Sequence, residues 1–168
     1  NLFDNYALNY DKHMQDTLHY ALPQKFGQLL HELELLQVEH ALDLGCGTGL
    51  SGIILKEISK HLTGVDLSPK MLAIAKEKGL FDELIQSDIQ HYLKSTQQSF
   101  EVILAADVIP YIENLQTLLQ LVARRLNSKG YFLFSHEISA HEDYILQKSA
   151  RFAHHPNMVK KALLKAGL

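Results

Sequence analysis

The sequence predicts a doubly wound, parallel α/β sheet. Two observations support this fold class. Short apolar runs alternate with amphipathic segments five times, and the links between them are short, as right-handed crossovers between parallel strands require. The first apolar run also ends in D-L-G-C-G-T-G over residues 43–49, which indicates a tight glycine turn between a buried strand and a helix.

The N-terminal segment leads into the first strand. Residues 1–16 are aromatic and polar without a clear period, so we expect a short helix or a lid-like arm. Apolar residues recur every three or four positions over 18–36, which predicts an amphipathic helix and makes 1–36 an N-terminal lid or helical arm. The first strand is expected over 37–44 and the first crossover helix over 50–59.

The second and third strands are expected over residues 62–66 and 84–86. Between them, Ser68 is placed as a helix N-cap and Pro69 as the first helical residue. Gly79 suits the position just past the end of that helix, because glycine adopts the left-handed conformation found there.

The fourth strand, 100–106, is apolar almost throughout, as expected when helices cover both faces of a sheet. A helix over 115–126 and a fifth strand over 131–135 complete a Rossmann-like core, residues 37–135, with strand order 3-2-1-4-5. No strand is expected after the fifth, and 151–168 reads as a helix.

Composition limits the setting and the partners. The 168 residues fit one domain, and the net charge of -3 with scattered lysines and arginines leaves no basic stripe, so we expect no nucleic-acid partner. The single cysteine, Cys46, cannot form an internal disulfide, and no apolar run approaches the roughly 20 residues of a membrane span. We therefore expect a cytoplasmic protein without a membrane partner.

The glycine turn indicates a ligand with an adenosine part and a positive charge. Leu50 stands where a dinucleotide-binding loop has its last glycine, and the G-K-[ST] ending of a phosphate-binding loop is missing. Asp43 would repel a pyrophosphate but would attract an ammonium or a sulfonium group.

Acidic residues end each of the first three expected strands. Asp43 ends the first strand, Asp66 the second and Asp88 the third. Because ligands of open α/β sheets bind at the carboxyl ends of the strands, we expect these side chains to line one site.

Four segments resemble, in order and spacing, the successive motifs of class I S-adenosylmethionine-dependent methyltransferases: residues 42–49, 63–75, 86–89 and 100–111. The resemblance implies S-adenosylmethionine as the cofactor and S-adenosylhomocysteine as its product. It also implies two further strands beyond the fifth, which this sequence does not show. We therefore expect 136–168 to be a truncated substrate-side segment, with a homodimer partner or missing strands covering the edge of strand five.

The resemblance assigns roles to the glycine loop and the second strand. Asp43 would hold the methionine ammonium through water, while Gly45 and Gly47, on either side of Cys46, would give backbone contacts. Asp66 would accept hydrogen bonds from both ribose hydroxyls.

By the same resemblance, Leu67 and Met71 would pack against the adenine. Asp88 would accept from its exocyclic amine, and Ile89 would offer a backbone donor. Two small residues would lie under the methionine part, Ala105 and Ala106.

The exit of the fourth strand bears on the methyl acceptor. Residues 107–111 read D-V-I-P-Y, whereas methyltransferases that act on base amines or amide nitrogens often carry N/D-P-P-Y/F there. The departure favours a small-molecule acceptor, as in quinone, biotin-precursor or natural-product pathways. Residues 3–11 and 151–155 also resemble bacterial methyltransferase domains that are fused to tetratricopeptide repeats.

A hydroxyl acceptor would need a base, and several side chains are candidates. The candidates are Tyr10, His13, His136, His154 and His155. We favour His154 and Tyr10, the latter also as a cofactor lid. A metal site formed by His136, His141, His154 and His155 matches no standard zinc spacing, and we expect none.

Two other functions remain compatible with the sequence. One is a non-catalytic module or subunit that binds S-adenosylmethionine, because the sequence identifies no certain base. The other is an NAD(P)-dependent oxidoreductase, since Asp66 would also suit the ribose of a dinucleotide, although Leu50 argues against it.

Overall fold

The computed structural model describes residues 10–14, 21–140 and 144–168. Of the expected N-terminal arm it includes the short helix α2 (Tyr10–Lys12) and helix α3 (Leu22–Glu32), which buries Phe26 and Leu30. The aromatic residues at positions 3 and 6 lie outside the described residues. The division into an arm, a core and a C-terminal segment stays a prediction.

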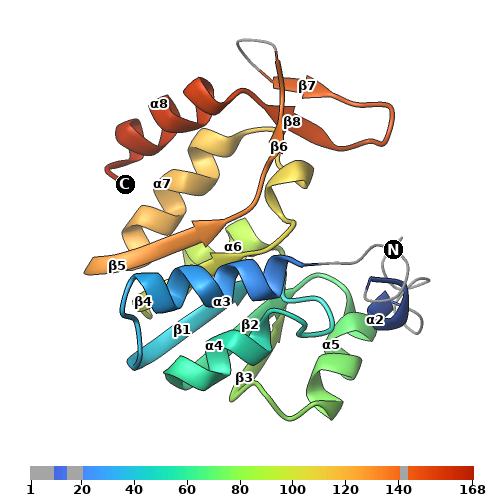
Figure 1. Ribbon diagram of the computed structural model, residues 1–168, viewed down its shortest axis with the longest axis vertical. Coiled ribbons are helices and arrows are strands. Elements are labelled where there is room, and N and C mark those ends of the chain that lie inside the picture. Colours follow the sequence, from blue (N-terminus) through green and yellow to red (C-terminus); the bar gives the residue numbers. More distant parts are fainter. Residues whose placement is uncertain (1–9, 15–20, 141–143) are drawn as a thin grey trace.

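Five strands form the central sheet: β1 (Val38–Leu44), β2 (Ser59–Asp66), β3 (Glu83–Gln86), β4 (Phe100–Ala105) and β5 (Leu126–Phe134). Their order is β3-β2-β1-β4-β5, and all four neighbouring pairs are parallel (Figure 1). The predicted Rossmann-like fold and its strand order are confirmed. β5 ends the sheet, and what covers its outer edge stays a prediction.

Helices cover both faces of this sheet: α4 (Gly52–Ile58) with α3 on one, and α6 (Ile89–Ser95) with α7 (Leu115–Arg125) on the other. Helix α8 (Pro156–Ala166) packs on α7. Successive side chains of a strand point to opposite faces. In β4, Val102 and Leu104 therefore pack with α3 and α4, while Ile103 packs with the other group. The alternation explains why a strand that is apolar throughout is needed here.

Helix α5 (Pro69–Glu77) begins and ends where the sequence predicts. The Ser68 hydroxyl accepts a hydrogen bond from the backbone N–H of Met71 at 3.2 Å, and Pro69 is the first helical residue. Gly79 lies just beyond the helix with φ +63°. The N-cap and C-terminal assignments are confirmed.

The expectation of no strand after the fifth is wrong. Three short strands, β6 (Glu137–Ile138), β7 (Tyr144–Leu146) and β8 (Phe152–His154), form a second sheet in the order β6-β8-β7. The helix expected from residue 151 begins only at Pro156. Strands of two or three residues are too short to show a period, and the partners that fix them are distant in sequence.

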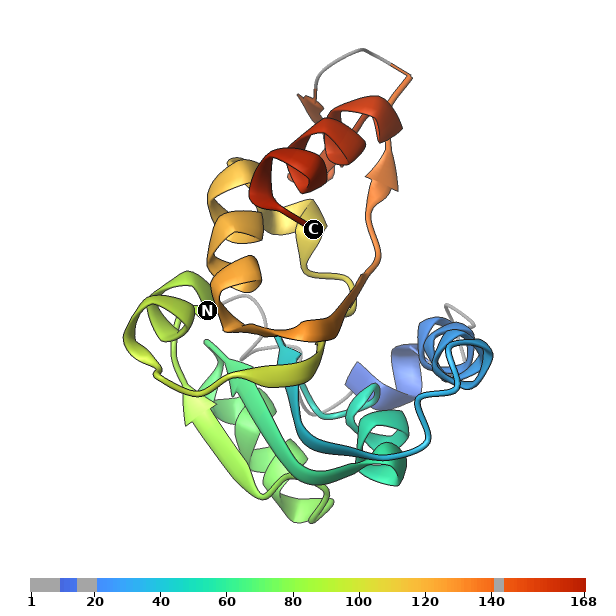
Figure 2. The ribbon, with the colours of Figure 1, turned by 90° about the vertical axis from the view of Figure 1, so that its left-hand side faces the viewer.

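The second sheet, α7 and α8 gather at one end of the molecule, away from β3 and α5 (Figures 1 and 2). A single 3-10 turn, η3 (Ile109–Tyr111), links β4 to α7 and lies between this end and the central sheet. Within the described ranges, no helix is both long and apolar enough to cross a membrane.

Candidate functional site

The glycine loop after β1 is fixed to the end of β2 by its own backbone. Gly45 N–H donates to the Val65 carbonyl at 2.8 Å, and Gly47 N–H donates to Asp66 Oδ2 at 2.9 Å. Both glycines have positive φ, +66° and +54°. Because these two N–H groups are used within the protein, a ligand would meet the carbonyls and Cα atoms of the loop instead.

The three glycines of the loop differ in the space around their Cα atoms. A Cβ on Gly45 would lie 2.5 Å from Val108 Cγ2, and one on Gly49 would lie 2.9 Å from the Phe81 ring. A Cβ on Gly47 would meet nothing within 4 Å. Gly45 and Gly49 therefore allow close packing, whereas Gly47 leaves space open beside the loop.

That space belongs to a cavity of about 350 Å3 at the carboxyl ends of the strands, a size typical of small-ligand sites. Nine residues that the sequence assigns to the cofactor line it: Tyr10, Gly45, Gly47, Asp66, Leu67, Met71, Asp88, Ile89 and Ala106. Leu67 is 58% exposed although it is a large apolar side chain, as a wall for a flat apolar group would be. Every charged side chain in the lining is acidic, the third being Asp107.

A smaller hollow of about 30 Å3 adjoins the cavity beneath the glycine loop. It is lined by Asp43 and Cys46, and it shares Tyr10, Gly47 and Ala106 with the larger cavity. Ala105 lines neither hollow, because it is fully buried within β4. Of the two alanines assigned to the methionine part, the structure brings only Ala106 to the site.

Asp43 is a buried carboxylate without a partner for one of its oxygens. It is 1% exposed, and Oδ2 accepts no hydrogen bond from any residue that the structure describes. Burial, and then the charge of Asp66, raise the pKa of Asp43 to about 8. A buried carboxylate in this state is stabilised by a cation or a strong donor entering the hollow beside it.

Asp66 links the glycine loop to helix α5. Its Oδ2 accepts from Gly47 N–H, and its Oδ1 accepts from Ser68 N–H at 2.8 Å. A carboxylate offers about four lone-pair sites, so each oxygen can also accept from a ligand hydroxyl. The two backbone donors therefore hold the carboxylate in place at the cavity wall.

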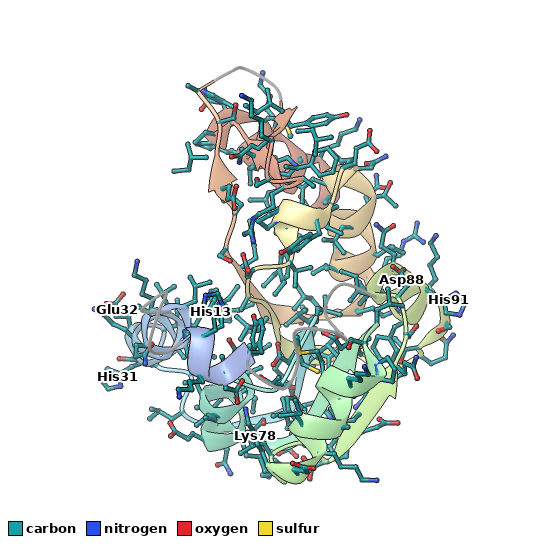
Figure 3. All side chains as sticks on the ribbon, turned by 90° about the vertical axis from the view of Figure 1, so that its right-hand side faces the viewer. His13, His31, Glu32, Lys78, Asp88 and His91 are labelled. Carbon is teal, nitrogen blue, oxygen red and sulfur yellow. The ribbon has the colours of Figure 1, made fainter. Side chains whose placement is uncertain are left out.

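Asp88 has a structural role that its position at a strand end did not reveal. It is the N-cap of α6, a helix that the sequence interpretation missed, and Asp88 Oδ1 accepts from Gln90 N–H at 3.0 Å and His91 N–H at 2.9 Å. Figure 3 shows Asp88 and His91 together at this end of the helix. Both bonds end on one oxygen, so Oδ2 can still face a ligand amine.

Tyr10 reaches the site from α2, which Asp11 anchors. Asp11 accepts hydrogen bonds from the Thr48 hydroxyl of the glycine loop and from the Lys78 ammonium. Burial, followed by the charge of Asp107, raises the pKa of Tyr10 above its usual range. The phenol therefore stays protonated at neutral pH and is suited to donate a hydrogen bond rather than to act as a base.

The exit of β4 holds a charged cluster. Asp107 has φ +58°, and its N–H donates to Ser135 Oγ at 2.8 Å. Arg151, just before β8, donates to the Asp107 carboxylate with both terminal nitrogens and to Glu137 with Nε. It also donates to the Tyr111 hydroxyl at 3.1 Å, with the guanidinium 5.1 Å from that ring centroid.

The candidate histidines lie elsewhere. His154 is fully buried and lines neither hollow, and its pKa is lowered first by burial and then by His136. His155 caps α8, its Nδ1 accepting from Asn157 N–H at 3.1 Å. His141 lies outside the described residues, and the residues that are described include no group of three or more side chains able to hold a metal.

The sequence interpretation missed the roles of Asp107, Tyr111 and Arg151. One signal was available, because Asp107 stands at the end of the expected fourth strand as the other three acids stand at the ends of theirs. Arg151 lies in the segment 151–155 that carries a family resemblance, but this gave it no role, and its partners lie 14 and 44 residues away in the chain.

Comparison with known proteins places this site in a family. Residues 42–134, more than half of the chain, match the methyltransferase domain family. The chain is 28% identical over 141 residues to sterol 4-C-methyltransferase strm-1 of Caenorhabditis elegans, covering 73% of this chain and 42% of that protein. It is 32% identical over 113 residues to the mouse 18S rRNA (guanine-N(7))-methyltransferase, covering 64% of this chain and 39% of that protein.

A third relative is the ubiquinone biosynthesis O-methyltransferase of Vibrio atlanticus. The chain is 24% identical to it over 122 residues, which cover 70% of this chain and 52% of that protein. The chain thus spans between a third and a little over half of the length of these relatives. Among solved structures, a DhpI–S-adenosylhomocysteine complex superposes with a TM-score of 0.73 at 17% identity, covering 98% of this chain and 83% of that one.

A methyltransferase from Clostridium acetobutylicum that depends on S-adenosylmethionine superposes with a TM-score of 0.70 at 21% identity, covering 99% and 87%. These likenesses show the fold, and the match over residues 42–134 shows the family. The resemblance that the glycine loop and the strand-end acids indicate is confirmed: the chain belongs to the methyltransferase domain family.

Proposed function

We propose that this protein transfers the methyl group of S-adenosylmethionine to a small acceptor that is neutral or positively charged. The observation that supports it best is Asp43, a buried carboxylate with one unpartnered oxygen beside a hollow that opens into the main cavity. The ammonium group of S-adenosylmethionine supplies the positive charge that this carboxylate lacks. A dinucleotide would instead bring a pyrophosphate toward the same carboxylate.

The remaining lining fits the rest of the same ligand. Asp66, held by two backbone donors, would accept from the ribose hydroxyls. Leu67 and Met71 would pack on the adenine, and Asp88 would accept from its amine. The methyl group is activated by the sulfonium that carries it, so the protein's main task is to hold the acceptor in line with it.

Asp107 and Tyr10 are suited to hold the acceptor. Both line the cavity, and the charge of Asp107 acts on the Tyr10 phenol, so the two groups are neighbours. Asp107 can accept from an acceptor O–H or N–H, while the protonated Tyr10 can donate. Arg151 is already bonded to two carboxylates, which leaves the cluster with an excess negative charge that would disfavour an anionic acceptor.

A small acceptor is favoured over RNA although relatives include rRNA methyltransferases. A strand of RNA would bring phosphates to a cavity whose charged lining is wholly acidic, and no lysine or arginine in that lining would offset them. We also infer a cytosolic location, since the one cysteine is a buried thiol without a disulfide partner.

The first experiment is calorimetric titration of the protein with S-adenosylmethionine, S-adenosylhomocysteine and NADH. We expect binding of the first two and loss of at least about 100-fold in affinity in Asp66→Ala, since an orienting charged group is removed. Asp82→Ala is the matched control, because Asp82 likewise accepts from a backbone N–H, that of Leu62 at 2.7 Å, but lies outside the cavity. Binding of NADH alone would overturn the proposal.

A second experiment separates an enzyme from a module that only binds the cofactor. The protein is incubated with methyl-labelled S-adenosylmethionine and either a small-metabolite extract or total RNA. Label is expected in the small-molecule fraction and not in nuclease-sensitive material. Label in RNA would overturn the choice of acceptor, and cofactor binding without any transfer would favour the non-catalytic module.

A further inference from the structure

The charge of the chain is divided unevenly along its length. Residues 1–113 hold 16 acidic residues against 8 lysines and arginines, whereas residues 114–168 hold 3 acidic residues against 8 lysines and arginines. The net charge of -3 thus combines an acidic first two thirds of the chain with a basic C-terminal third. Three of these positive charges lie at the end of α7 and in β5, and the other five lie between β7 and β8 and in α8, at one end of the molecule (Figure 2).

A groove of about 620 Å3 lies at this basic end, between the start of α7 and one face of α8. Leu115, Met158 and Ala162 form its apolar floor, Lys161 and Lys165 stand at its rim, and Tyr144 of β7 forms a wall. The groove shares no lining residue with the cofactor cavity.

The face of α8 that lines the groove has a helical spacing. Met158, Lys161, Ala162 and Lys165 are separated by three and four positions, so they form one stripe. Both lysines are exposed, and α8 contains no acidic residue to pair with them. The stripe therefore offers apolar contact with positive charge beside it.

We propose that the groove between α7 and α8 is a docking site for an acidic amphipathic helix of a partner protein. Such a helix would place apolar side chains at intervals of three and four residues on the floor, as helices do when they bind in grooves. Its carboxylates would lie against Lys161 and Lys165. Charge complementarity of this kind selects the partner and accelerates its approach.

The lining favours a protein over a nucleic acid. Glu113 lies on the α7 side of the groove, where it accepts from the Tyr144 hydroxyl at 3.4 Å, whereas Lys161 and Lys165 lie on α8. Negative charge on a partner is therefore favoured along the α8 side alone. The lining includes one exposed ring, Tyr144, whereas single-stranded nucleic acid stacks successive bases on several rings along a positively charged track. A helix with separate apolar and acidic sides satisfies both features.

The groove is next to the acceptor end of the cavity. Ile112 lines the cavity and the following residue, Glu113, lines the groove. A docked partner would therefore lie beside Tyr111 rather than beside the glycine loop. The proposal does not depend on methyl transfer, because it rests on the charge and shape of a separate surface.

Fluorescence anisotropy tests the proposal with a defined probe. The probe is a labelled 18-residue helical peptide with leucines at spacings of three and four and glutamates flanking them; its partner probe has lysines in place of every glutamate. We expect the acidic peptide alone to bind, and Lys161→Glu/Lys165→Glu to weaken it by about tenfold or more, more strongly at low salt. Met158→Gln should also weaken it, at unchanged charge.

Lys25→Glu/Lys76→Glu is the matched control, because it makes the same change of net charge with exposed helical lysines outside the groove. It should alter the affinity by less than about twofold. Equal losses in both double variants, equal binding of both peptides, or no binding would overturn the proposal. So would a labelled oligonucleotide that binds more tightly and depends on the same two lysines. Cofactor titration should be unchanged in all variants, which separates this result from the proposed function.

Discussion

The acidic residues at the two ends of the cofactor site differ in their hydrogen-bond partners. At the glycine loop, Asp43 is buried and one of its oxygens has no partner among the described residues. At the exit of β4, Asp107 is bound by both terminal nitrogens of Arg151. The first carboxyl group therefore keeps its proton up to a pKa of about 8, whereas the second is paired within the protein.

The presence or absence of a partner indicates what each acidic residue does: one is suited to bind a ligand, and the other holds parts of the protein together. A buried charge without a partner destabilises the protein, so it is retained where a ligand compensates it. A charged residue that is paired within the protein connects the two segments that carry the partners. Here the Arg151–Asp107 pair connects the exit of β4 to the second sheet, because Arg151 also donates to Glu137 of β6.

The largest expected effect concerns Asp43 and pH. Its pKa of about 8 in the folded protein lies above the 3.8 of an aspartate in an unfolded chain, so the folded state binds the extra proton and stability falls as pH rises between these values. Each unit of separation contributes about 1.4 kcal/mol, so several kcal/mol are at stake. Thermal unfolding of the ligand-free protein should show this fall between pH 5 and 8.

Asp43→Asn provides the comparison, since its amide stays neutral throughout. The variant should match the unchanged protein near pH 4 and below, exceed its stability increasingly as the pH rises to 8, and bind S-adenosylmethionine far more weakly. If the two proteins showed the same pH dependence, Asp43 would not be the unpartnered charge described here.

The two glycines beside this charge should respond differently to alanine. Gly45→Ala combines a positive φ with a Cβ at 2.5 Å from Val108 and should cost about 2–4 kcal/mol of unfolding free energy. Gly47→Ala should cost about 1 kcal/mol, from φ alone, yet reduce cofactor affinity because its methyl group enters the cavity. Denaturant unfolding and calorimetry on the same two proteins measure both quantities; similar stability losses would contradict these roles.

At the other end, Arg151→Met should lower the free energy of unfolding by about 1–3 kcal/mol, because two partly buried carboxylates lose their partner. Lys60→Met is the control. It breaks the exposed Lys60–Glu39 pair, with an expected loss below about 0.5 kcal/mol. Cofactor affinity should be nearly unchanged in both, and a large loss of affinity in Arg151→Met would show that the two ends are not independent.

The smallest effect is expected at Asp88, where two roles can be separated. Asp88→Ala should cost about 1 kcal/mol through loss of the α6 cap, and Asp88→Ser should restore most of it. If Asp88 also accepts from the adenine amine, Asp88→Ser should still bind S-adenosylmethionine several-fold more weakly. Recovery of affinity together with stability would leave Asp88 as a cap alone.

Much of the cofactor side could be predicted because its signals are local. The loop over residues 43–49, the Ser68 cap with Pro69, and the acids at strand ends each depend on neighbours within a few positions. Local chemistry of this kind is what sequence patterns record. The strand order followed from the same motifs.

The acceptor side could not be predicted because its contacts are distant. Arg151 meets Asp107 across 44 residues, and the strands of the second sheet are only two or three residues long. Asp88 shows another limit, since one acid at a strand end can cap the next helix and line a site. Sequence position alone does not distinguish these roles.

The Phe81 ring packs closely against three glycines, so it affects which combinations of mutations the protein tolerates. Added Cβ atoms on Gly49, Gly52 and Gly64 would lie within 2.9, 2.6 and 2.7 Å of this one ring. The fitness effects of substitutions at these positions should therefore be epistatic with the side chain at position 81. Gly52→Ala, whose close contacts are all with the ring, should be harmful beside phenylalanine and nearly neutral beside leucine. Relatives that diverge at this point are then expected to change the ring before the glycine.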